Sequence, residues 1–518
     1  MNPDPPRDKP PPLEALPLES APEDSPSLDA PSLDAPPSEV PAASARPYTL
    51  PRERRIYVNR SLRMEHIDWV GFDMDYTLAI YRQEEIDQVS IQATVKKLLD
   101  RGYPPALGEA VYDTRFPIRG LLIDKRHGHI LKMDRYKFVG KAWHGLRELS
   151  RAERHDLYHA RKVRVAPPRY HYIDTLYALP EAALYAGAVD LLDRYGHNVD
   201  YVHLFDDIRE CIDEAHRDGS IVDEIARDLP RFVARDPELA GALHKLRSAG
   251  KRLFLLTNSR WGYTDNMMRY LLDGQLGEYP SWRQYFDVVS VAAAKPAFFT
   301  ERRVTLERAV EGGQETTRPA TELERGHVYE GGNLKDFERM LGAYGDRILY
   351  VGDHIYGDIL RSKKDSAWRT VMIVQEMAAE FSAQERAHGD IALLDGHLRR
   401  RERLEDELRH HQARLKELGR AKDAREDAVR IRLRRVVDRL RQTLLEIDAL
   451  VRTLERSTDA VFHPYWGSLF KQGTELSSFG DQVEEYACLY TTRVSNFIHY
   501  APQHFFRSPR DLMPHELV

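Results

Sequence analysis

Apolar runs of strand length recur along the middle of the chain, and polar residues follow each of them closely. The five runs are residues 66–81, 252–259, 285–296, 347–354 and 369–376. Helical patterns such as those of residues 236–250 and 335–344 lie before or between them. This alternation of buried strands with helices predicts an α/β fold with a parallel, doubly wound sheet.

The first two runs are separated by far more chain than a crossover between neighbouring strands needs. We therefore expect residues 82–235 to form an inserted domain, and residues 48–81 and 236–395 to form the catalytic core. The last residues, 461–518, are expected to be a C-terminal helical segment that packs on this core.

Residues 396–460 carry a different pattern, in which apolar positions recur every three or four residues. The repeating positions are Leu404, Leu408, His411, Leu415 and Leu418, and then, after Gly419, Val429, Leu433, Val436, Leu440, Leu444, Ile447, Val451 and Leu454. This spacing predicts two long amphipathic helices in an antiparallel hairpin, with Pro464 ending the second. Residues 396–456 hold 18 basic and 12 acidic residues. We interpret these charges as solvated helix faces rather than as a site for nucleic acid or for the acidic tail.

The N-terminal residues 1–47 contain 14 of the chain's 30 prolines, together with three basic and nine acidic residues. Such a segment buries too little apolar surface to offset its ordering entropy, so we predict a disordered tail. A docking site for a proline-recognising module is the weaker alternative. The tail accounts for the formal net charge of −6 of the whole 518-residue chain, and the remaining residues are balanced.

Composition excludes several classes of protein. Balanced charge outside the tail argues against a dedicated nucleic-acid binder. An apolar share of 42% allows a large core, and two cysteines, Cys211 and Cys488, are too few for a disulfide scaffold. No stretch approaches the ~18 apolar residues of a membrane span, and the first residues lack a secretory apolar region. We therefore expect a cytoplasmic protein without nucleic-acid or membrane partners.

Four polar clusters follow the first four apolar runs or end them. They are Asp73-Met74-Asp75-Tyr76-Thr77, Thr257-Asn258-Ser259, Lys295-Pro296 and Gly352-Asp353-His354-Ile355-Tyr356-Gly357-Asp358. Ligands bind at the carboxyl ends of the strands in sheets of this kind, so we expect the four clusters to converge in space.

The residue types in these clusters suit phosphoryl transfer. A carboxylate can attack phosphorus and form an aspartyl-phosphate, which divides one displacement into two. Asp73 is the expected nucleophile, and Asp75 the general acid and base. Because a carboxylate and a phosphate repel each other, a divalent cation is required. Mg²⁺ prefers oxygen ligands such as those of Asp73 and Asp353, and Asp358 would orient this shell.

The remaining polar residues would bind the phosphate. Lys295 is expected to neutralise its charge, and Thr257 and Asn258 to donate hydrogen bonds to its oxygens, with Ser259 in the same substrate-binding group. Each residue alone has an ordinary alternative, since an aspartate at a strand end is often a cap and a lysine before proline is often a surface residue. The ordered combination favours the catalytic interpretation.

The order DxDxT, a later Thr or Ser, a Lys and GDxxxxD resembles the signature of the haloacid dehalogenase-like phosphatases. Longer segments resemble the purine-type cytosolic 5′-nucleotidases, from about residue 50 to the end, with the proline-rich tail and much of the helical arm outside the likeness. These segments are GFDMDYTLA, LLTNS, KPAFF, VGDHIYGDILRSKK, IDTLYALPE and DLMPHEL. The resemblance implies a haloacid dehalogenase-like core with an inserted cap domain, homotetramers, and the backbone carbonyl of Asp75 as a further Mg²⁺ ligand.

The resemblance also implies how a nucleoside is recognised. Arg209, Asp213 and His216 fall at positions i, i+4 and i+7, on one face of a predicted helix. In the family, the residues matching Arg209 and Asp213 bind a 6-oxopurine, and the aromatic matching Tyr177 stacks on the base. The alternative is a surface Arg–Asp pair beside a buried tyrosine. The chain departs from the family at Val222, where a lysine is usual.

A second site in the family binds ATP-type activators. The matching positions here are Arg164, Asp174, Tyr356, Lys364, Gln482 and Glu485. Asp174 replaces an amide and Glu485 replaces an arginine, and both changes disfavour a polyphosphate. We therefore expect weak or altered control by such effectors.

The leading hypothesis is a Mg²⁺-dependent 5′-nucleotidase that acts on IMP, GMP and their deoxy forms, with nucleoside phosphotransfer as an activity that the family permits. One alternative is a phosphatase of the same superfamily with another phosphorylated metabolite as substrate. Another is a catalytically idle scaffold that assembles through the helical arm, although Asp73, Asp75, Asp353 and Asp358 are all present.

Overall fold

The computed structural model describes residues 50–518, apart from 160–162, 164–167, 197–198, 312–313, 361–365, 420–423, 510–512, 514–515 and 517–518. The chain divides into residues 1–49 and residues 50–518, and the description concerns the second part. The prediction of a disordered tail over residues 1–47 lies outside the described residues.

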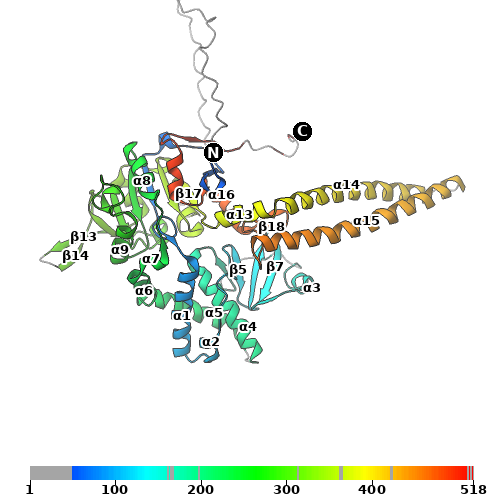
Figure 1. The fold of residues 1–518 in the computed structure, drawn as a ribbon, viewed down its shortest axis with the longest axis horizontal. Coiled ribbons are helices and arrows are strands. Elements are labelled where there is room, and N and C mark those ends of the chain that lie inside the picture. Colours follow the sequence, from blue (N-terminus) through cyan, green and yellow to red (C-terminus); the bar gives the residue numbers. More distant parts are fainter. Residues whose placement is uncertain are drawn as a thin grey trace, which may run out of the picture. The chain divides into compact units, whose positions relative to one another are not determined.

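A ten-stranded sheet forms the core, and Figure 1 labels its strands β13, β14 and β17. Its strand order is β1-β20-β17-β16-β3-β11-β12-β15-β13-β14. Neighbouring strands from β20 to β15 are parallel, while β1, β13 and β14 pair antiparallel to their neighbours. The strands are β1 (Tyr57–Val58), β3 (Trp69–Phe72), β11 (Arg252–Leu256), β12 (Val288–Val291), β13 (Thr305–Glu311), β14 (Gln314–Pro319), β15 (Val328–Gly331), β16 (Ile348–Gly352), β17 (Arg369–Ile373) and β20 (Leu489–Thr491). The five predicted strands are its centre, and the predicted α/β fold class is confirmed.

Alternating residues of the central strands pack on opposite faces of the sheet, which is why helices cover both. On β3, Val70 and Phe72 belong to the apolar cluster that includes residues of helices α8 and α9. Trp69, pointing the other way, packs in the cluster that includes residues of α11. The core helices are α8 (Leu239–Ser248), α9 (Trp261–Leu272), α10 (Ala297–Thr300), α11 (Leu334–Leu341) and α13 (Met377–Arg386).

The strand register brings the polar clusters to one edge of the sheet. Phe72, the last residue of β3, pairs with Leu255 of β11 on one side and with Val351 of β16 on the other. The residues that follow these three positions by one or two places therefore leave the sheet at the same end. Asp73, Thr257 and Asp353 are among them.

The long segment between β3 and β11 is an insertion with its own antiparallel sheet, in the order β8-β7-β6-β5-β9. Its strands are β5 (Leu121–Asp124), β6 (His129–Met133), β7 (Val139–His144), β8 (Arg147–Glu148) and β9 (Tyr170–Ile173). Its helices are α1 (Gln83–Asp100), α2 (Ala106–Glu109), α3 (Arg151–Arg154), α4 (Leu179–Arg194), α5 (Tyr201–Arg217), α6 (Val222–Arg227) and α7 (Leu229–Phe232). Two-residue strands form three further pairs, β2 (Leu62–Arg63) with β21 (Phe505–Phe506), β4 (Ile80–Tyr81) with β10 (Val233–Ala234), and β18 (Lys471–Gln472) with β19 (Glu475–Leu476).

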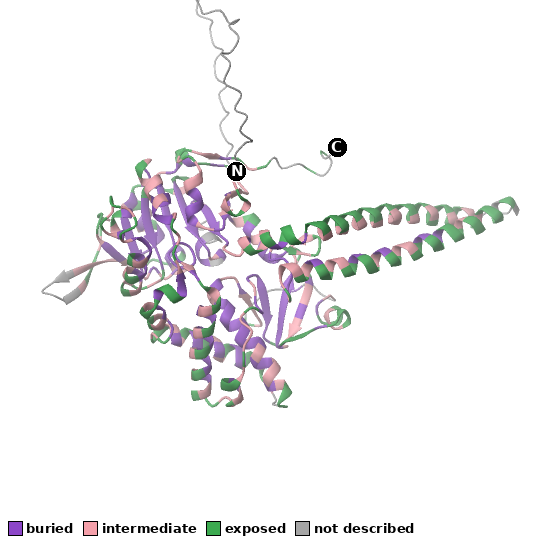
Figure 2. Cartoon of the chain, in the orientation of Figure 1, coloured by how far each residue is buried: buried purple, intermediate pink, exposed green. Residues whose placement is uncertain are grey.

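Two long helices, α14 (His388–Leu418) and α15 (Ala424–Phe462), lie side by side as the predicted hairpin. Most of their surface is exposed (Figure 2). Two positions of the predicted apolar seam are wrong, because Val429 and Val436 are 43% and 36% exposed. Val437, which was not predicted, is buried at 4% exposure. With Val437 in this place, the positions from Leu433 to Leu454 alternate in steps of four and three, which is the seven-residue repeat of a seam between two packed helices.

The C-terminal segment differs from the prediction of a helical segment. Its one described α-helix is α16 (Ser478–Tyr486), and it is followed by β20, which joins the main sheet between β17 and β1. The expectation of a helix here is therefore wrong for residues 489–491, which are a core strand. The other predicted domain boundaries stay predictions. Of the helices in the described part of the chain, none is both long and apolar enough to cross a bilayer.

The fold makes a stability prediction at Gly71 in β3. A Cβ added there would lie 2.0 Å from Cζ of the Phe254 ring. We expect Gly71→Ala to lower the free energy of unfolding by about 3 kcal/mol, measured by urea denaturation. Gly396→Ala in α14 is the control, because its added Cβ has no neighbour within 4 Å and alanine favours the helix. Equal stability of the two variants would contradict the packing argument.

Candidate active site

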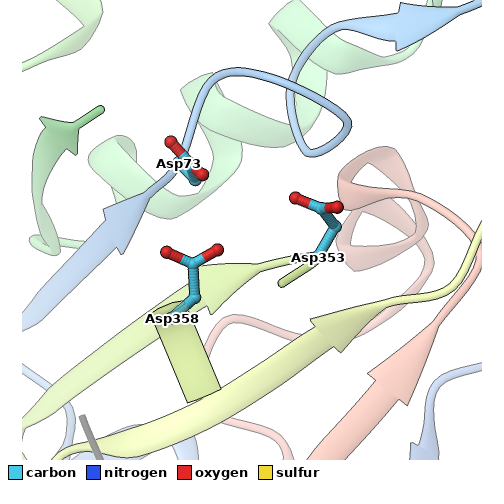
Figure 3. Close-up of side chains that lie close together, drawn as sticks. All are labelled: Asp73, Asp353 and Asp358. Atoms are coloured by element: carbon cyan, nitrogen blue, oxygen red, sulfur yellow. The ribbon is translucent and has the colours of Figure 1, made fainter. Parts of the chain in front are cut away.

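Three carboxylates meet at the carboxyl edge of the main sheet. Asp73 follows β3, Asp353 follows β16, and Asp358 lies in the helical turn Ile355–Leu360. One oxygen from each of the three lies within 4.8 Å of the others (Figure 3). Asp353 and Asp358 are buried at 3% and 1% exposure, and Asp73 is nearly as enclosed at 8%. The two sequence clusters predicted to converge here do so.

The backbone holds Asp73 firmly in place. Its N–H donates to the carbonyl of Val351 across the sheet at 2.9 Å, and its Oδ1 accepts from the N–H of Met74 at 2.8 Å. The chain then turns at once, because the N–H groups of Leu78 and Ala79 both donate to the Met74 carbonyl. This tight loop directs Asp75 away from the three-carboxylate group.

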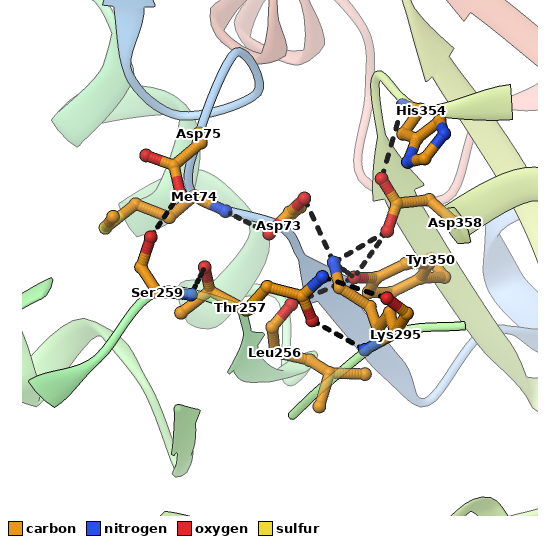
Figure 4. A network of polar contacts seen from close by, with 11 residues as sticks. Asp73, Met74, Asp75, Leu256, Thr257, Ser259, Lys295, Tyr350, His354 and Asp358 are labelled. Carbon is orange, nitrogen blue, oxygen red and sulfur yellow. Dashed lines mark hydrogen bonds and ion pairs between the residues drawn. The ribbon is translucent and has the colours of Figure 1, made fainter. Parts of the chain in front are cut away.

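Lys295 brings a positive charge into the same group (Figure 4). Its Nζ lies 2.6 Å from Oδ1 of Asp358, 2.8 Å from the Tyr350 hydroxyl and 3.0 Å from Oδ2 of Asp73. Burial alone favours the neutral amine, but Asp358 and Asp73 outweigh it and raise the pKa of Lys295. The lysine is therefore an ammonium ion that partly offsets the buried carboxylates.

Asn258 fixes the backbone of this lysine. Its Oδ1 accepts from the Lys295 N–H at 2.6 Å, and its Nδ2 donates to the Lys295 carbonyl at 3.0 Å. Thr257 is fully buried, and its hydroxyl accepts from the N–H of Ser259 at 3.1 Å. The three residues predicted to bind phosphate are thus brought to the site, and their contact with a substrate stays a prediction.

The donor set fits a hard divalent cation. Oδ2 of Asp353 is buried and has no hydrogen-bond partner among the residues that the structure describes. Burial and the neighbouring Asp358 raise the pKa of Asp353 to about 7, and burial also raises the pKa of Asp73. A cluster of carboxylate oxygens whose negative charge Lys295 only partly offsets matches the ligands that Mg²⁺ prefers. The residues that would hold the ion are Asp73 and Asp353, with Asp358 beside them.

Asp75 has a different environment from its neighbours. Its Oδ1 accepts from the Tyr81 hydroxyl at 2.5 Å, and its Oδ2 from the Ser259 hydroxyl at 2.6 Å. The Tyr263 hydroxyl lies a further 2.8 Å from that of Tyr81. Burial raises the pKa of Asp75 in spite of these hydrogen bonds. A carboxyl group with a raised pKa suits a general acid.

Aromatic rings connect this loop with the predicted base-binding face of α5. The Tyr177 ring packs edge-on against Tyr76, at 4.8 Å between centroids, and against His216 at 5.8 Å. On the same helix, Arg209 lies 3.7 Å from Asp213 and 3.0 Å from Oε2 of Glu181, a buried residue of α4. The predicted base-recognition residues are therefore grouped beside the loop that follows β3, and Arg209 already has an internal partner in Glu181.

The structure describes only some of the predicted effector residues. Arg164, Lys364 and the side chain of Tyr356 lie outside the described residues. Asp174 contacts His354, with 3.3 Å between Oδ2 and Nε2. Burial opposes charge on this imidazole, but the hydrogen bond with Asp174 raises the pKa of His354 to about 9. Gln482 and Glu485 lie on α16, and effector binding stays a prediction.

A model of the 5′ nucleotidase family matches residues 56–518. The chain belongs to this family. It is 29% identical over 468 residues to a 5′-nucleotidase domain-containing protein of Dictyostelium discoideum, which covers 89% of this chain and 74% of that protein. It is also 34% identical to the 5′-nucleotidase domain-containing protein 2 of Rattus norvegicus and 33% identical to that of Homo sapiens, each over 338 residues. These two matches cover 63% of this chain but only 60% and 64% of the relatives, so less than two thirds of either relative is spanned.

Two solved structures also match this nucleotidase-family chain. They are CbbY from Rhodobacter sphaeroides in complex with phosphate and a 2-haloacid dehalogenase from Pseudomonas syringae pv. Tomato DC3000, with TM-scores of 0.23 and 0.22. Each is 15% identical and covers 59% of this chain and 86% of its own. Overlap this low carries no argument about the reaction.

Several residues of the site were missed from the sequence. Tyr350 had a signal, because it is a polar residue inside an apolar strand and its hydroxyl contacts Lys295. Glu376, whose carboxylate accepts from Arg119, had a weaker signal as the last residue of an apolar run predicted to be a strand. Arg119 had none, since it comes from the insertion and donates to the carbonyl of Asp353 at 2.8 Å.

The raised pKa of Asp353 predicts how the metal-free protein responds to pH. An unfolded aspartate loses its proton near pH 4, whereas the folded one keeps it to about pH 7. The folded state then binds more protons between these values, so the free energy of unfolding in EDTA falls as pH rises from about 4 to about 7. We expect the affinity for a divalent cation such as Mg²⁺ to rise over the same range, because a bound cation would displace the proton.

Thermal unfolding in EDTA from pH 5 to 8 measures this slope, and calorimetric titration with Mg²⁺ measures the affinity. Asp353→Asn should give a shallower slope than the parent, while the exposed Asp438→Asn on α15 should leave it unchanged. Identical slopes in parent and Asp353→Asn would show that the carboxyl of Asp353 is not the titrating group.

Proposed function

We propose that this member of the 5′ nucleotidase family is a Mg²⁺-dependent hydrolase of 6-oxopurine nucleoside 5′-monophosphates. The observation that carries the proposal is the arrangement of Asp73, Asp353 and Asp358 within 4.8 Å, with Lys295 bonded to the first and the last. Asp75, enclosed and with a raised pKa, lies two residues beyond the nucleophile.

The chemistry follows from the residues around Asp73. An Oδ atom of Asp73 attacks phosphorus, the bond from phosphorus to O5′ breaks, and Asp75 gives its proton to O5′ so that the nucleoside leaves. A water oxygen then attacks the same phosphorus, Asp75 takes the water's proton, and the bond from Asp73 to phosphorus breaks. Inorganic phosphate leaves, and both carboxyl groups return to their starting states.

Charge is the main obstacle to the first step, because a dianionic phosphate must approach a carboxylate. Lys295 supplies one fixed positive charge 3.0 Å from Asp73. A bound Mg²⁺, held by Asp73, Asp353 and the Asp75 carbonyl, would supply the charge that draws phosphate and carboxylate together. Ser259 and Tyr81 hold the carboxyl of Asp75, and burial keeps its proton available for the leaving oxygen.

The α5 face supports a purine with an oxygen at position 6. The Asp213 carboxylate would accept from N1–H of hypoxanthine or guanine, and it would meet a lone pair at N1 of adenine. Tyr177 would stack on the base. The proximity of Tyr177 to both Tyr76 and His216 supports a nucleoside lying between the catalytic loop and α5.

The nucleophile is tested with Asp73→Asn, since a carboxamide cannot form the aspartyl-phosphate. We expect phosphate release from IMP to fall to background, and Asp75→Asn to lower it by roughly 10²- to 10⁴-fold. Asp68→Asn, at the opposite end of β3, should retain full activity because its ion pair with Arg347 is at the surface. Turnover by Asp73→Asn would refute the mechanism.

Base recognition is tested with Asp213→Asn. Loss of a charged acceptor should lower kcat/KM for IMP and GMP by roughly ten- to a hundred-fold. It should also reduce the ratio of these values to kcat/KM for AMP. Glu210→Gln, an exposed neighbour on α5, is the control and should change neither value. A screen of nucleoside monophosphates in which AMP or a pyrimidine nucleotide exceeds IMP and GMP would instead support a different phosphatase substrate.

A further inference from the structure

Two strand ends of the inserted sheet contact the loop that follows β16. This loop, residues 353–358, holds Asp353 and Asp358 and is called the metal-ligand loop. Arg119 lies two residues before β5, and Asp174 directly follows β9. The two ends are joined because the N–H of Gly120 donates to the carbonyl of Ile173 at 2.6 Å. Arg119 and Asp174 are therefore presented together by one rigid pair of strands.

The side chain of Arg119 forms a hydrogen bond with the backbone of the metal-ligand loop. Its Nη1 donates to the carbonyl of Asp353 at 2.8 Å, and its Nε and Nη2 donate to the two carboxylate oxygens of Glu376, each at 2.7 Å. The guanidinium side chain is fully buried, and it lies 5.0 Å from the centre of the Phe479 ring. A planar guanidinium held at three points has little freedom to move.

Asp174 contacts the next residue of the same loop. Its Oδ2 lies 3.3 Å from Nε2 of His354. The insertion thus contacts two successive residues, Asp353 through the main chain and His354 through the side chain. Between these contacts the Oδ2 of Asp353 stays buried and has no hydrogen-bond partner among the described residues.

We propose that Arg119 and Asp174 are positioning residues of the metal centre, through which the inserted segment holds Asp353 in its ligating orientation. The inference rests on the proposed function, because it concerns the ion that Asp73 and Asp353 would hold. Neither residue touches the ion or the substrate. They act through the backbone of Asp353 and the ring of His354. The affinity for the metal ion therefore depends on how the inserted segment packs against the core.

The alternative is that Arg119 only adds stability, as an ordinary buried ion pair would. The chain offers a matched comparison in Arg169, whose Nε and Nη2 donate to the two oxygens of Asp124 at 2.8 and 2.6 Å. This pair lies in the same inserted sheet and has the same two-point geometry. Among the described residues, the side-chain hydrogen bonds of Arg169 join it to Asp124 and His127, and neither belongs to the metal-ligand loop.

The test measures Mg²⁺ binding to the full chain by calorimetry, without substrate. Outer contacts of this kind change metal affinity by roughly ten- to a hundred-fold. We expect such a loss for Arg119→Lys, which keeps the charge but cannot hold both Glu376 and the Asp353 carbonyl. A smaller loss is expected for Asp174→Asn. Arg169→Lys should bind Mg²⁺ as the parent does, even where its thermal stability falls.

Three outcomes are decisive. Weaker Mg²⁺ binding by Arg119→Lys but not by Arg169→Lys supports the inference. Parent-like binding by Arg119→Lys, or equal losses in the two lysine variants, overturns it and leaves the proposed function standing. A parent protein that binds no Mg²⁺ overturns both. If Arg119→Lys does not fold, Glu376→Gln tests the same contact from the other side and should also weaken Mg²⁺ binding.

Discussion

Repulsion among buried carboxylates at one edge of the sheet is the constraint on which the rest of the site depends. Asp73, Asp353 and Asp358 bring oxygens within 4.8 Å of one another in an enclosed place, where like charges interact far more strongly than in water. Lys295 offsets part of that charge, and burial together with the remaining repulsion raises the pKa values of Asp73 and Asp353. The negative charge of this group is balanced only if carboxyl groups keep their protons or if a further positive charge binds.

Packing in the apolar core holds Lys295 in this position. Because β3 has no side chain at Gly71, the Phe254 ring can lie directly over the strand. Phe254 stacks at 10° between ring planes with Tyr350, and the Tyr350 hydroxyl contacts Nζ of Lys295 at 2.8 Å. Packing on one face of the sheet therefore fixes a charge at its edge, and Asn258 fixes the main chain of the same lysine.

The convergence of Asp73, Lys295 and Asp353 could be predicted from the sequence, because residues that follow neighbouring parallel strands leave the sheet at a common edge. The place of Arg119 could not, since nothing local relates an arginine in an insertion to a carbonyl more than two hundred residues away. Val437 was missed for a different reason, because Val436 and Val437 are adjacent valines and only a strict alternation of four and three from Leu433 selects the second. The strand at residues 489–491 is only three residues long and begins just after α16 ends, so its pattern does not stand out in the sequence. Long-range partners decided the places of Arg119 and of residues 489–491, whereas the repeat along the helix decides that of Val437.

The position of β20 bears on how the protein is made. β17 gains its outer neighbour only from residues 489–491, and β1, near the start of the described chain, pairs with the same short strand. A ribosome must therefore deliver the chain as far as residue 491 before that side of the sheet can close. Until then, β17 would expose unpaired amide and carbonyl groups, which are the surfaces on which nascent chains aggregate. The helical arm, synthesised between the two strands, lengthens this exposed interval.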